Sequence, residues 1–239
     1  MVFVCTIALC LLVSQAHGAD PRLPGQRADA PRWTWAVGKL SVSGQKYAGK
    51  QRRFHMENCS ATLIAQPQKK QARHIVSAWH CFEHYRDLTH PIGFTLPTAA
   101  GKPLQRSARL LSSGGDMRGD WAVLELSEPI TTQHAPALPV LPQATDTDAI
   151  TLAGFSRDDG LGRSGEQLSY HSNCRILSRQ GNVWRSNCLA FKGASGGAVV
   201  QINEGTAYLV GVVSAGNGED VSLFIPVRVF RQELRRLMR

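Results

Sequence analysis

The chain has 239 residues, of which 43% are hydrophobic and 19% are charged, a composition typical of a globular protein rather than a disordered one. An all-β unit often reaches this length without dividing, so we expect a single folded unit with its own core. The formal net charge is +9, but the Lys and Arg residues are scattered along the chain. Without a long basic run or interleaved aromatic residues, we expect no nucleic-acid partner.

The first 18 residues have the pattern of a secretory signal peptide. An apolar run ends at Ala16-His17-Gly18, which fits a small-residue cleavage site, so the mature chain is expected to begin near Ala19. The run lacks the usual basic residue after its first position, and it is too short to span a bilayer. We therefore predict a secreted protein, periplasmic or extracellular, with no stable membrane insertion.

Short strands dominate the rest of the chain. Residues 19–32 are rich in Pro, Gly, Ala and Arg and are expected to form a flexible leader, with order beginning near Trp33. From there, alternating or β-branched runs such as WTWAVGKLSV, CSATLIA, DWAVLEL and SLFIPV are separated by Gly, Pro and Asn. Regularly spaced short strands of this kind predict an all-β barrel or sandwich.

A Pro-rich segment interrupts the series of predicted strands, and a helical pattern follows the last of them. Residues 135–142, APALPVLP, divide the strand-forming sequence into halves and suit a connection between two barrels, because Pro fixes an extended backbone. A long loop within one barrel is the alternative. Near the C-terminus, Val229, Phe230, Leu234 and Leu237 can share one face, which predicts a short packing helix.

Four cysteines remain after removal of the signal peptide: Cys59, Cys81, Cys174 and Cys188. In an exported chain they imply two disulfides, for which sequence alone permits three connectivities. The competing zinc site lacks a Cys-x-x-Cys or a paired-His spacing, so we expect no metal.

Residues 192–199, KGASGGAV, form a candidate nucleophile turn. Ser195 is preceded by Gly193 and followed by two glycines, a pattern that can expose a hydroxyl while aiming two amide N–H groups at one point. The same composition also occurs in plain surface loops, so this segment is only moderately specific.

Two further segments could supply a base and a carboxylate. In HIVSAWHC a β-branched run ends at His80, whose imidazole could act as a general base if a carboxylate fixes its tautomer. In GDWAVLEL, Asp120 opens an apolar run and is either a turn former or a carboxylate close to the core. Asp116 is the competing carboxylate, but no strand follows it, so we favour Asp120.

Together these segments resemble the trypsin/chymotrypsin-like serine proteases from about Val37 to the C-terminal helix. CSATLIA and HIVSAWHC are similar to the family's first Cys strand and its Ala-Ala-His-Cys box, and DWAVLEL to the strand that begins at the catalytic Asp. KGASGGAV is similar to the Gly-Asp-Ser-Gly-Gly-Pro box, and LVGVVSAG to the strand before the substrate-binding edge. The resemblance implies two six-stranded antiparallel β-barrels over residues 33–239, with a short C-terminal helix.

By this resemblance the chain would be a serine endopeptidase that works through an acyl-enzyme. Ser195 would be the nucleophile, His80 the base and Asp120 the carboxylate that orients it, while the N–H groups of Gly193 and Ser195 would form the oxyanion hole. The implied disulfides are Cys59–Cys81 and Cys174–Cys188. The implied substrate-contacting residues are Leu189, Lys192, Ser214, Ala215, Gly216 and Ser222, of which residues 214–216 would pair with extended substrate. We expect a protein or peptide substrate, no cofactor and a monomeric enzyme.

The sequence departs from the family at two positions. Ala194 stands where animal members carry an Asp that pairs with a newly cut N-terminus, so that activation switch is not expected. Leu189 stands at the base of the specificity pocket in place of an Asp, which disfavours cleavage after Lys or Arg. Glu219 or Asp220 could still supply a carboxylate, but an apolar or small side chain before the cut is favoured.

Two other functions are compatible with parts of the sequence. A catalytically silent homologue could bind an anionic partner through its basic surface, although such proteins usually lack one of the three catalytic residues. An esterase on an α/β-hydrolase fold would use the Gly-x-Ser-x-Gly elbow at residues 193–197, but it requires the order Ser, Asp, His and many helices.

Overall fold

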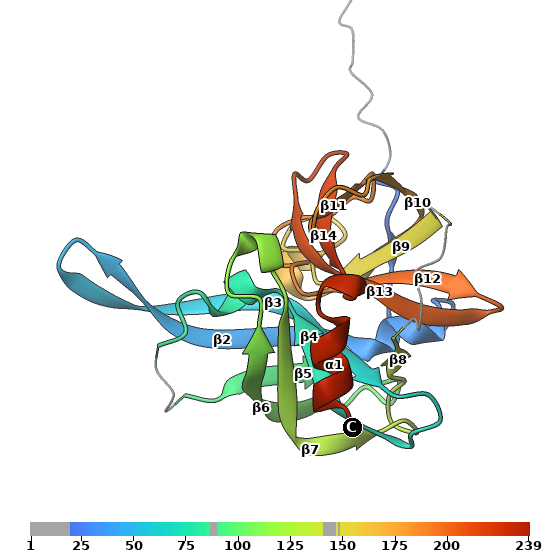
Figure 1. Cartoon of the computed structure of the whole chain (residues 1–239), viewed down its shortest axis with the longest axis horizontal. Helices are drawn as coiled ribbons and strands as arrows, with labels where there is room; N and C mark the ends of the chain where they lie inside the picture. Colours follow the sequence, from blue (N-terminus) through green and yellow to red (C-terminus); the bar gives the residue numbers. More distant parts are fainter. Residues whose placement is uncertain (1–19, 87–89, 141–146, 148) are drawn as a thin grey trace, which may run out of the picture.

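The computed structural model describes residues 20–86, 90–140, 147 and 149–239. Its strands form two antiparallel sheets, each of which closes on itself (Figure 1). In the first barrel the strands pair in the order β2-β5-β6-β7-β4-β3, and pairing of β2 with β3 completes the circle. Its strands are β2 (Val37–Ala48), β3 (Gln51–Ala65), β4 (Gln71–Ser77), β5 (Ile92–Leu96), β6 (Leu104–Ser113) and β7 (Ala122–Thr131).

The second barrel repeats this arrangement with the order β10-β11-β14-β13-β12-β9, closed by pairing of β10 with β9. Its strands are β9 (Ala149–Gly154), β10 (Ser169–Ser178), β11 (Trp184–Ser186), β12 (Ala198–Asn203), β13 (Thr206–Gly216) and β14 (Ser222–Pro226). Two short strands lie outside the circles, β1 (Leu23–Pro24) on β10 and β8 (Leu138–Pro139) on β3. The predicted pair of six-stranded barrels is confirmed.

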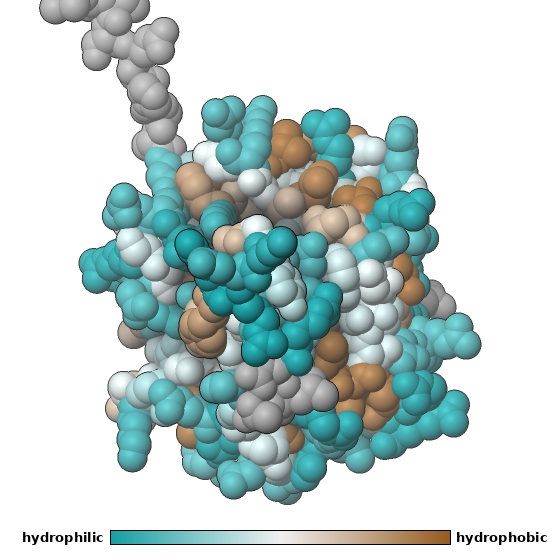
Figure 2. Space-filling view, turned by 90° about the vertical axis from the view of Figure 1, so that its left-hand side faces the viewer, coloured by the Kyte–Doolittle hydropathy of each residue, from teal (hydrophilic) through white to brown (hydrophobic). Residues whose placement is uncertain are grey.

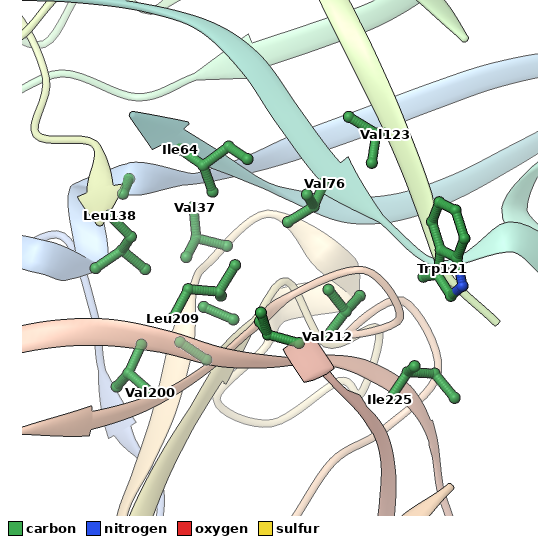
Figure 3. Packing of buried hydrophobic residues seen from close by; sticks show 14 of the residues in the cluster. Val37, Ile64, Val76, Trp121, Val123, Leu138, Val200, Leu209, Val212 and Ile225 are labelled. Carbon is green, nitrogen blue, oxygen red and sulfur yellow. The ribbon is translucent and has the colours of Figure 1, made fainter. Parts of the chain in front are cut away.

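Three hydrophobic clusters hold the barrels together. One fills the first barrel and one the second, because alternate residues of each strand point inward, as Ile92, Phe94 and Leu96 do in β5. The third lies between the barrels and combines Val76 and Val123 of the first with other aliphatic side chains of the second (Figure 3). Since the active-site candidates come from both barrels, this third cluster sets their relative position.

The Pro-rich segment touches both barrels. Leu138 pairs with Ile64 of β3, and two residues later Val140 forms a bridge with Leu209 of β13. The segment follows the last strand of the first barrel and precedes the first strand of the second. Residues 141 and 142, at its predicted end, lie outside the described residues.

The predicted C-terminal helix is confirmed as α1 (Arg231–Leu237). Leu234 is buried, and the ring of Phe230 stacks on Trp121 of the first half at a centroid distance of 5.3 Å. Val229 and Leu237 pack beside them, so the predicted apolar face is the one that packs.

The leader differs from the expectation of a flexible segment. Leu23 and Pro24 pair with Tyr170 and Ser169 of β10, and Arg22 is only 5% exposed. Composition suggested flexibility because the segment is rich in Pro, Gly, Ala and Arg, but residues 22–24 are held by ion pairs and by strand pairing. Residues 1–18, the predicted signal peptide, lie outside the described residues. Within the described ranges, no helix combines the length and apolarity needed to cross a bilayer.

Strands β2 and β3 continue past the first barrel as a projecting hairpin (Figure 1). The register places Tyr47 opposite Arg52 and Lys46 opposite Arg53, so three basic side chains that are close in sequence share this hairpin. Figure 2 views the molecule from the hairpin side, where hydrophilic residues surround small separate hydrophobic areas.

Candidate active site

His80 lies just beyond the end of β4. The strand stops at Ser77, and a short 3-10 turn over Trp79–Phe82 carries the imidazole away from the barrel core. The adjacent Cys81 forms a disulfide with Cys59 of β3. The base candidate is therefore anchored to two strands of the first barrel.

Asp120, which lies two residues before β7, contacts His80. Its side chain is fully buried; Oδ2 lies 2.9 Å and Oδ1 3.1 Å from Nδ1 of His80, and Oδ1 accepts the backbone N–H of His80 at 2.8 Å. Ser214 of the second barrel donates its hydroxyl to Oδ2 at 2.5 Å. The competing Asp116 instead accepts the N–H groups of Arg118 and Gly119 as the cap of a 3-10 turn.

The pKa of His80 is set by two opposing effects. Burial favours the neutral imidazole and lowers the pKa, but the hydrogen bond and charge of Asp120, with smaller contributions from Glu57 and Glu83, outweigh burial and raise it above 6.5. The same hydrogen bond holds Nδ1 as the protonated nitrogen of the neutral ring, which leaves Nε2 as the basic one.

Ser195 lies in a turn that both barrels hold. Its carbonyl oxygen accepts the N–H of Ser60 from β3 at 2.8 Å, and the next residue, Gly196, donates its N–H to Val213 at 2.8 Å. The hydroxyl of Ser195 donates to the carbonyl of Ser214 at 3.2 Å. Within the described part of the chain, the hydroxyl of Ser195 forms no hydrogen bond with His80.

The peptide planes around Ser195 are fixed by their carbonyl groups. The carbonyl of Lys192 accepts the N–H of Arg157 at 2.7 Å, and the carbonyl of Ala194 accepts the N–H of Gly197 at 2.9 Å. In a trans peptide the N–H points away from its carbonyl, so the N–H groups of Gly193 and Ser195 face the opposite side. Within the described part of the chain, neither N–H is used in a hydrogen bond.

Two glycines make this turn possible. Gly193 has φ of +95°, and a Cβ there would lie 2.6 Å from the carbonyl oxygen of Phe155. Gly196 has φ of +83°, and a Cβ would lie 2.1 Å from the carbonyl oxygen of Ser60. Both positions require the left-handed region and a close backbone approach.

Ser60 is a residue whose contribution the sequence did not reveal. Its fully buried hydroxyl donates to the carbonyl of Gly193 at 2.9 Å and accepts the N–H of Phe155 at 2.8 Å. A single side chain of the first barrel thus holds two segments of the second. No spacing rule could have indicated it, since Phe155 is 95 residues away in sequence.

Two segments that contain expected substrate-contacting residues, 189–192 and 214–218, lie in contact. The N–H of Gly218 donates to the carbonyl of Ala190 at 3.1 Å, and a Cβ on Gly216 would lie 2.2 Å from the same oxygen. Leu189 is buried, and its N–H donates to Nδ1 of His171 at 2.8 Å. The backbones of residues 190 and 216 therefore approach each other closely.

The remaining substrate-contact candidates differ in exposure. Ala215 is half-buried, while Gly216 and Lys192, the first residue of the candidate nucleophile turn, are exposed. Ser222, expected to contact substrate, is fully buried, and its hydroxyl shares a 2.7 Å hydrogen bond with Ser186. Its hydroxyl is therefore occupied by a hydrogen bond inside the second barrel.

Possible metal ligands gather at one place among the described residues, where atoms of Cys59, His80 and Cys81 lie within 4.8 Å of one another. The two cysteines are joined to each other as a disulfide, so neither offers a thiolate to a metal ion. Cys174 and Cys188 form the second disulfide. Both pairings are those that the resemblance implied.

The two closed barrels, with a His–Asp pair and a Gly-flanked serine where they meet, define a chymotrypsin-like fold. A sequence profile of the trypsin family, described as Trypsin, matches residues 25–232. The chain therefore belongs to the trypsin family. The crystal structure of the thermostable serine protease AL20 from an extremophilic microorganism is similar, with 16% identity, a TM-score of 0.63, and coverage of 87% of this chain and 99% of that one. No curated protein matches this sequence.

Proposed function

We propose that the protein is a secreted serine endopeptidase in which Ser195, His80 and Asp120 act together. The single observation that carries this proposal is the hydrogen bond between Nδ1 of His80 and the buried carboxylate of Asp120. A carboxylate in that position fixes the tautomer of the ring and stabilises the imidazolium that forms during the reaction. Membership of the trypsin family supports peptide bonds as the substrate class.

In the proposed reaction the hydroxyl of Ser195 turns from the carbonyl of Ser214 toward Nε2 of His80. Its oxygen forms a bond to the substrate carbonyl carbon while His80 takes its proton, and the carbonyl electrons move onto oxygen. The N–H groups of Gly193 and Ser195 stabilise that oxyanion. The C–N bond then breaks as His80 returns the proton to the leaving amine, and water releases the acyl group by the same steps.

The extended substrate is proposed to add to β13 at residues 214–216. Ala215 and Gly216 pair with β14 on one side only, so the other edge of this segment is available to a peptide backbone. The close contact of Gly216 with Ala190 supports a small side chain before the cleaved bond.

A fluorophosphonate probe tests the proposed mechanism. The oxidised protein should become labelled stoichiometrically, with the adduct located on Ser195 by mass spectrometry and absent in Ser195→Ala. A folded, oxidised protein that does not react would contradict the proposal and favour a silent homologue that binds an anionic partner.

Secretion is tested separately from catalysis. Expressed from the full sequence in a bacterial host, the exported protein should begin at Ala19 when its N-terminus is sequenced. A product that keeps residues 1–18 would contradict the predicted cleavage site.

A further inference from the structure

Arg22 is a buried cation that the proposed mechanism does not use. Its side chain is 2% exposed and lies between two carboxylates. Nη1 and Nη2 donate to Asp158 at 2.8 and 2.9 Å, Nε and Nη2 donate to Asp20 at 3.0 and 2.6 Å, and Nη1 also reaches the hydroxyl of Ser169 at 3.4 Å. Hydrogen bonds from Arg22 lower the pKa of both carboxyls, so the cluster is ionised at neutral pH.

Arg22 belongs to an N-terminal arm, residues 20–25, that lies on the second barrel. The arm adds β1 to the edge of β10, and the N–H of Gly25 donates to the carbonyl of Leu168 at 2.8 Å. Most of the arm precedes the region matched by the trypsin-family profile, which begins at residue 25.

The guanidinium also contacts both segments that orient the Gly193 peptide. On one side, Asp158 directly follows Arg157, whose N–H holds the carbonyl of Lys192 at 2.7 Å. On the other side, Cζ of Arg22 lies 4.3 Å from the ring centroid of Phe191, the residue directly before Lys192. The carbonyl of Phe191 in turn accepts the N–H of Ala194 at 3.1 Å.

Residue 194 is a buried alanine, so its side chain has no carboxylate that could hold the 191–194 loop through an ion pair. We propose that Arg22 is a positioning residue that holds segments 155–158 and 191–193 so that the N–H of Gly193 faces the reacting carbonyl. This inference rests on the proposed function and adds a structural requirement that lies in the N-terminal arm.

A side chain within the arm holds the loop, so a newly cut N-terminus is not required. An added Gly-Ser extension before Asp20 should therefore leave kcat unchanged, whereas deletion of residues 20–24 should abolish it. Loss of activity in the extended protein would contradict the inference that Arg22, rather than a free N-terminus, holds the loop.

Arg22→Gln and Arg22→Lys test the side chain directly, with Arg27→Gln as the matched control. Arg27 is on the neighbouring turn, and its ion pair with Asp29 is exposed. Losing one oxyanion donor lowers kcat by about 10²-fold or more, and Arg22→Gln should approach that loss with KM changed less than about threefold. Arg22→Lys keeps the buried charge but cannot make the paired hydrogen bonds to Asp158, so it should fold and show an intermediate loss.

The readouts separate positioning from a general loss of folding. Affinity for a peptide boronic acid, whose oxygen would occupy the oxyanion hole, should fall in parallel with kcat, while the pH midpoint set by His80 should not move. Arg22→Lys with wild-type kcat and boronate affinity would overturn the inference, even if Arg22→Gln does not fold. A wild-type protein that the fluorophosphonate does not label would instead overturn the proposed function itself.

Discussion

Ser214 donates its hydroxyl to Oδ2 of Asp120 across the boundary between the two barrels, at 2.5 Å. The carbonyl of the same residue accepts the hydroxyl of Ser195 at 3.2 Å. One residue of β13 thus contacts both the buried carboxylate and the proposed nucleophile. Because the first contact uses its side-chain hydroxyl and the second its backbone carbonyl, a mutation can remove the first and keep the second.

Ser214→Ala removes the hydroxyl and keeps the carbonyl. A hydrogen bond to a charged group contributes about 1.5–3 kcal/mol, so kcat/KM should fall roughly 10- to 100-fold as Asp120 loses a donor. The comparison is made with Ser107→Ala, an exposed serine of β6. Equal rates in the two variants would mean that this hydrogen bond does not assist the base.

The rate should rise with pH as His80 loses its proton, because only the neutral ring can accept one. Since Asp120 raises the pKa of His80, the midpoint of fluorophosphonate labelling should lie above 6.5. Asp120→Asn should lower the maximal rate by about 10⁴-fold and move the midpoint to lower pH, because burial then acts without the opposing charge. A midpoint that does not move in Asp120→Asn would contradict the assignment of the pair.

The free energy of unfolding should fall as pH rises through the pKa of His80, whereas the labelling rate should rise over the same pH range. A raised pKa in the folded state means that protonated His80 stabilises the fold fully below pH 6.5, and this contribution is lost as pH rises through the folded-state value. Urea titrations across this range should show the loss in the wild type. The dependence should disappear in His80→Gln, and its persistence there would assign it to another group.

Ser60→Ala tests the link between the barrels. The variant leaves the N–H of Phe155 without its partner and frees the carbonyl of Gly193, so the free energy of unfolding should fall by about 1–3 kcal/mol. Activity should fall further than in the Ser107→Ala control, because Gly193 loses a restraint. Unchanged stability would show that neither hydrogen bond contributes in solution.

The narrow space between Ala190 and Gly216 predicts cleavage after small residues. In a peptide library, Gly or Ala before the cut should be favoured at least about tenfold over Phe, Lys or Arg, since a large side chain would require the backbones of residues 190 and 216 to separate. The Ser195→Ala variant, which should not cleave any peptide of the library, is the negative control. A preference for Lys or Arg would contradict this prediction and point to Glu219 or Asp220 as the partner of the cation.

The two disulfides should differ in their effects. Each closes a short loop, with separations of 22 and 14 residues, and the chain-entropy model gives about 3 kcal/mol for either. Replacing Cys59 and Cys81 by Ala should lower activity more than replacing Cys174 and Cys188, because Cys81 is covalently adjacent to His80. Activity measured well below each variant's melting temperature distinguishes this from simple destabilisation.

The barrels were predictable because their signals are local. Alternation within runs such as that of β2, where buried Leu40 and Val42 alternate with half-buried Lys39 and Ser41, determines which side chains face inward. The segments around His80, Asp120 and Ser195 are each continuous in sequence. The pairing of the cysteines came from the family resemblance, since spacing alone left three possibilities open.

The supporting contacts were not predictable because their partners are distant in sequence. Arg22 and Asp158 are 136 residues apart, and nothing in the composition of residues 19–32 indicates that one of its arginines is buried. The hydrogen bond between the hydroxyls of Ser222 and Ser186 was not predictable for the same reason, since the two residues are 36 positions apart.

The cluster between the barrels joins two bodies, and each cysteine pair of the described ranges lies within one of them, so neither disulfide connects the barrels. Slight separation of the barrels would move Ser60 from the nucleophile turn and Ser214 from Asp120 while both interiors stayed intact. Heat or mild denaturant should therefore inactivate the protein before tryptophan fluorescence or circular dichroism reports unfolding. Its working temperature range is then limited by how well the two barrels stay docked, and mutations that tighten that docking should extend it.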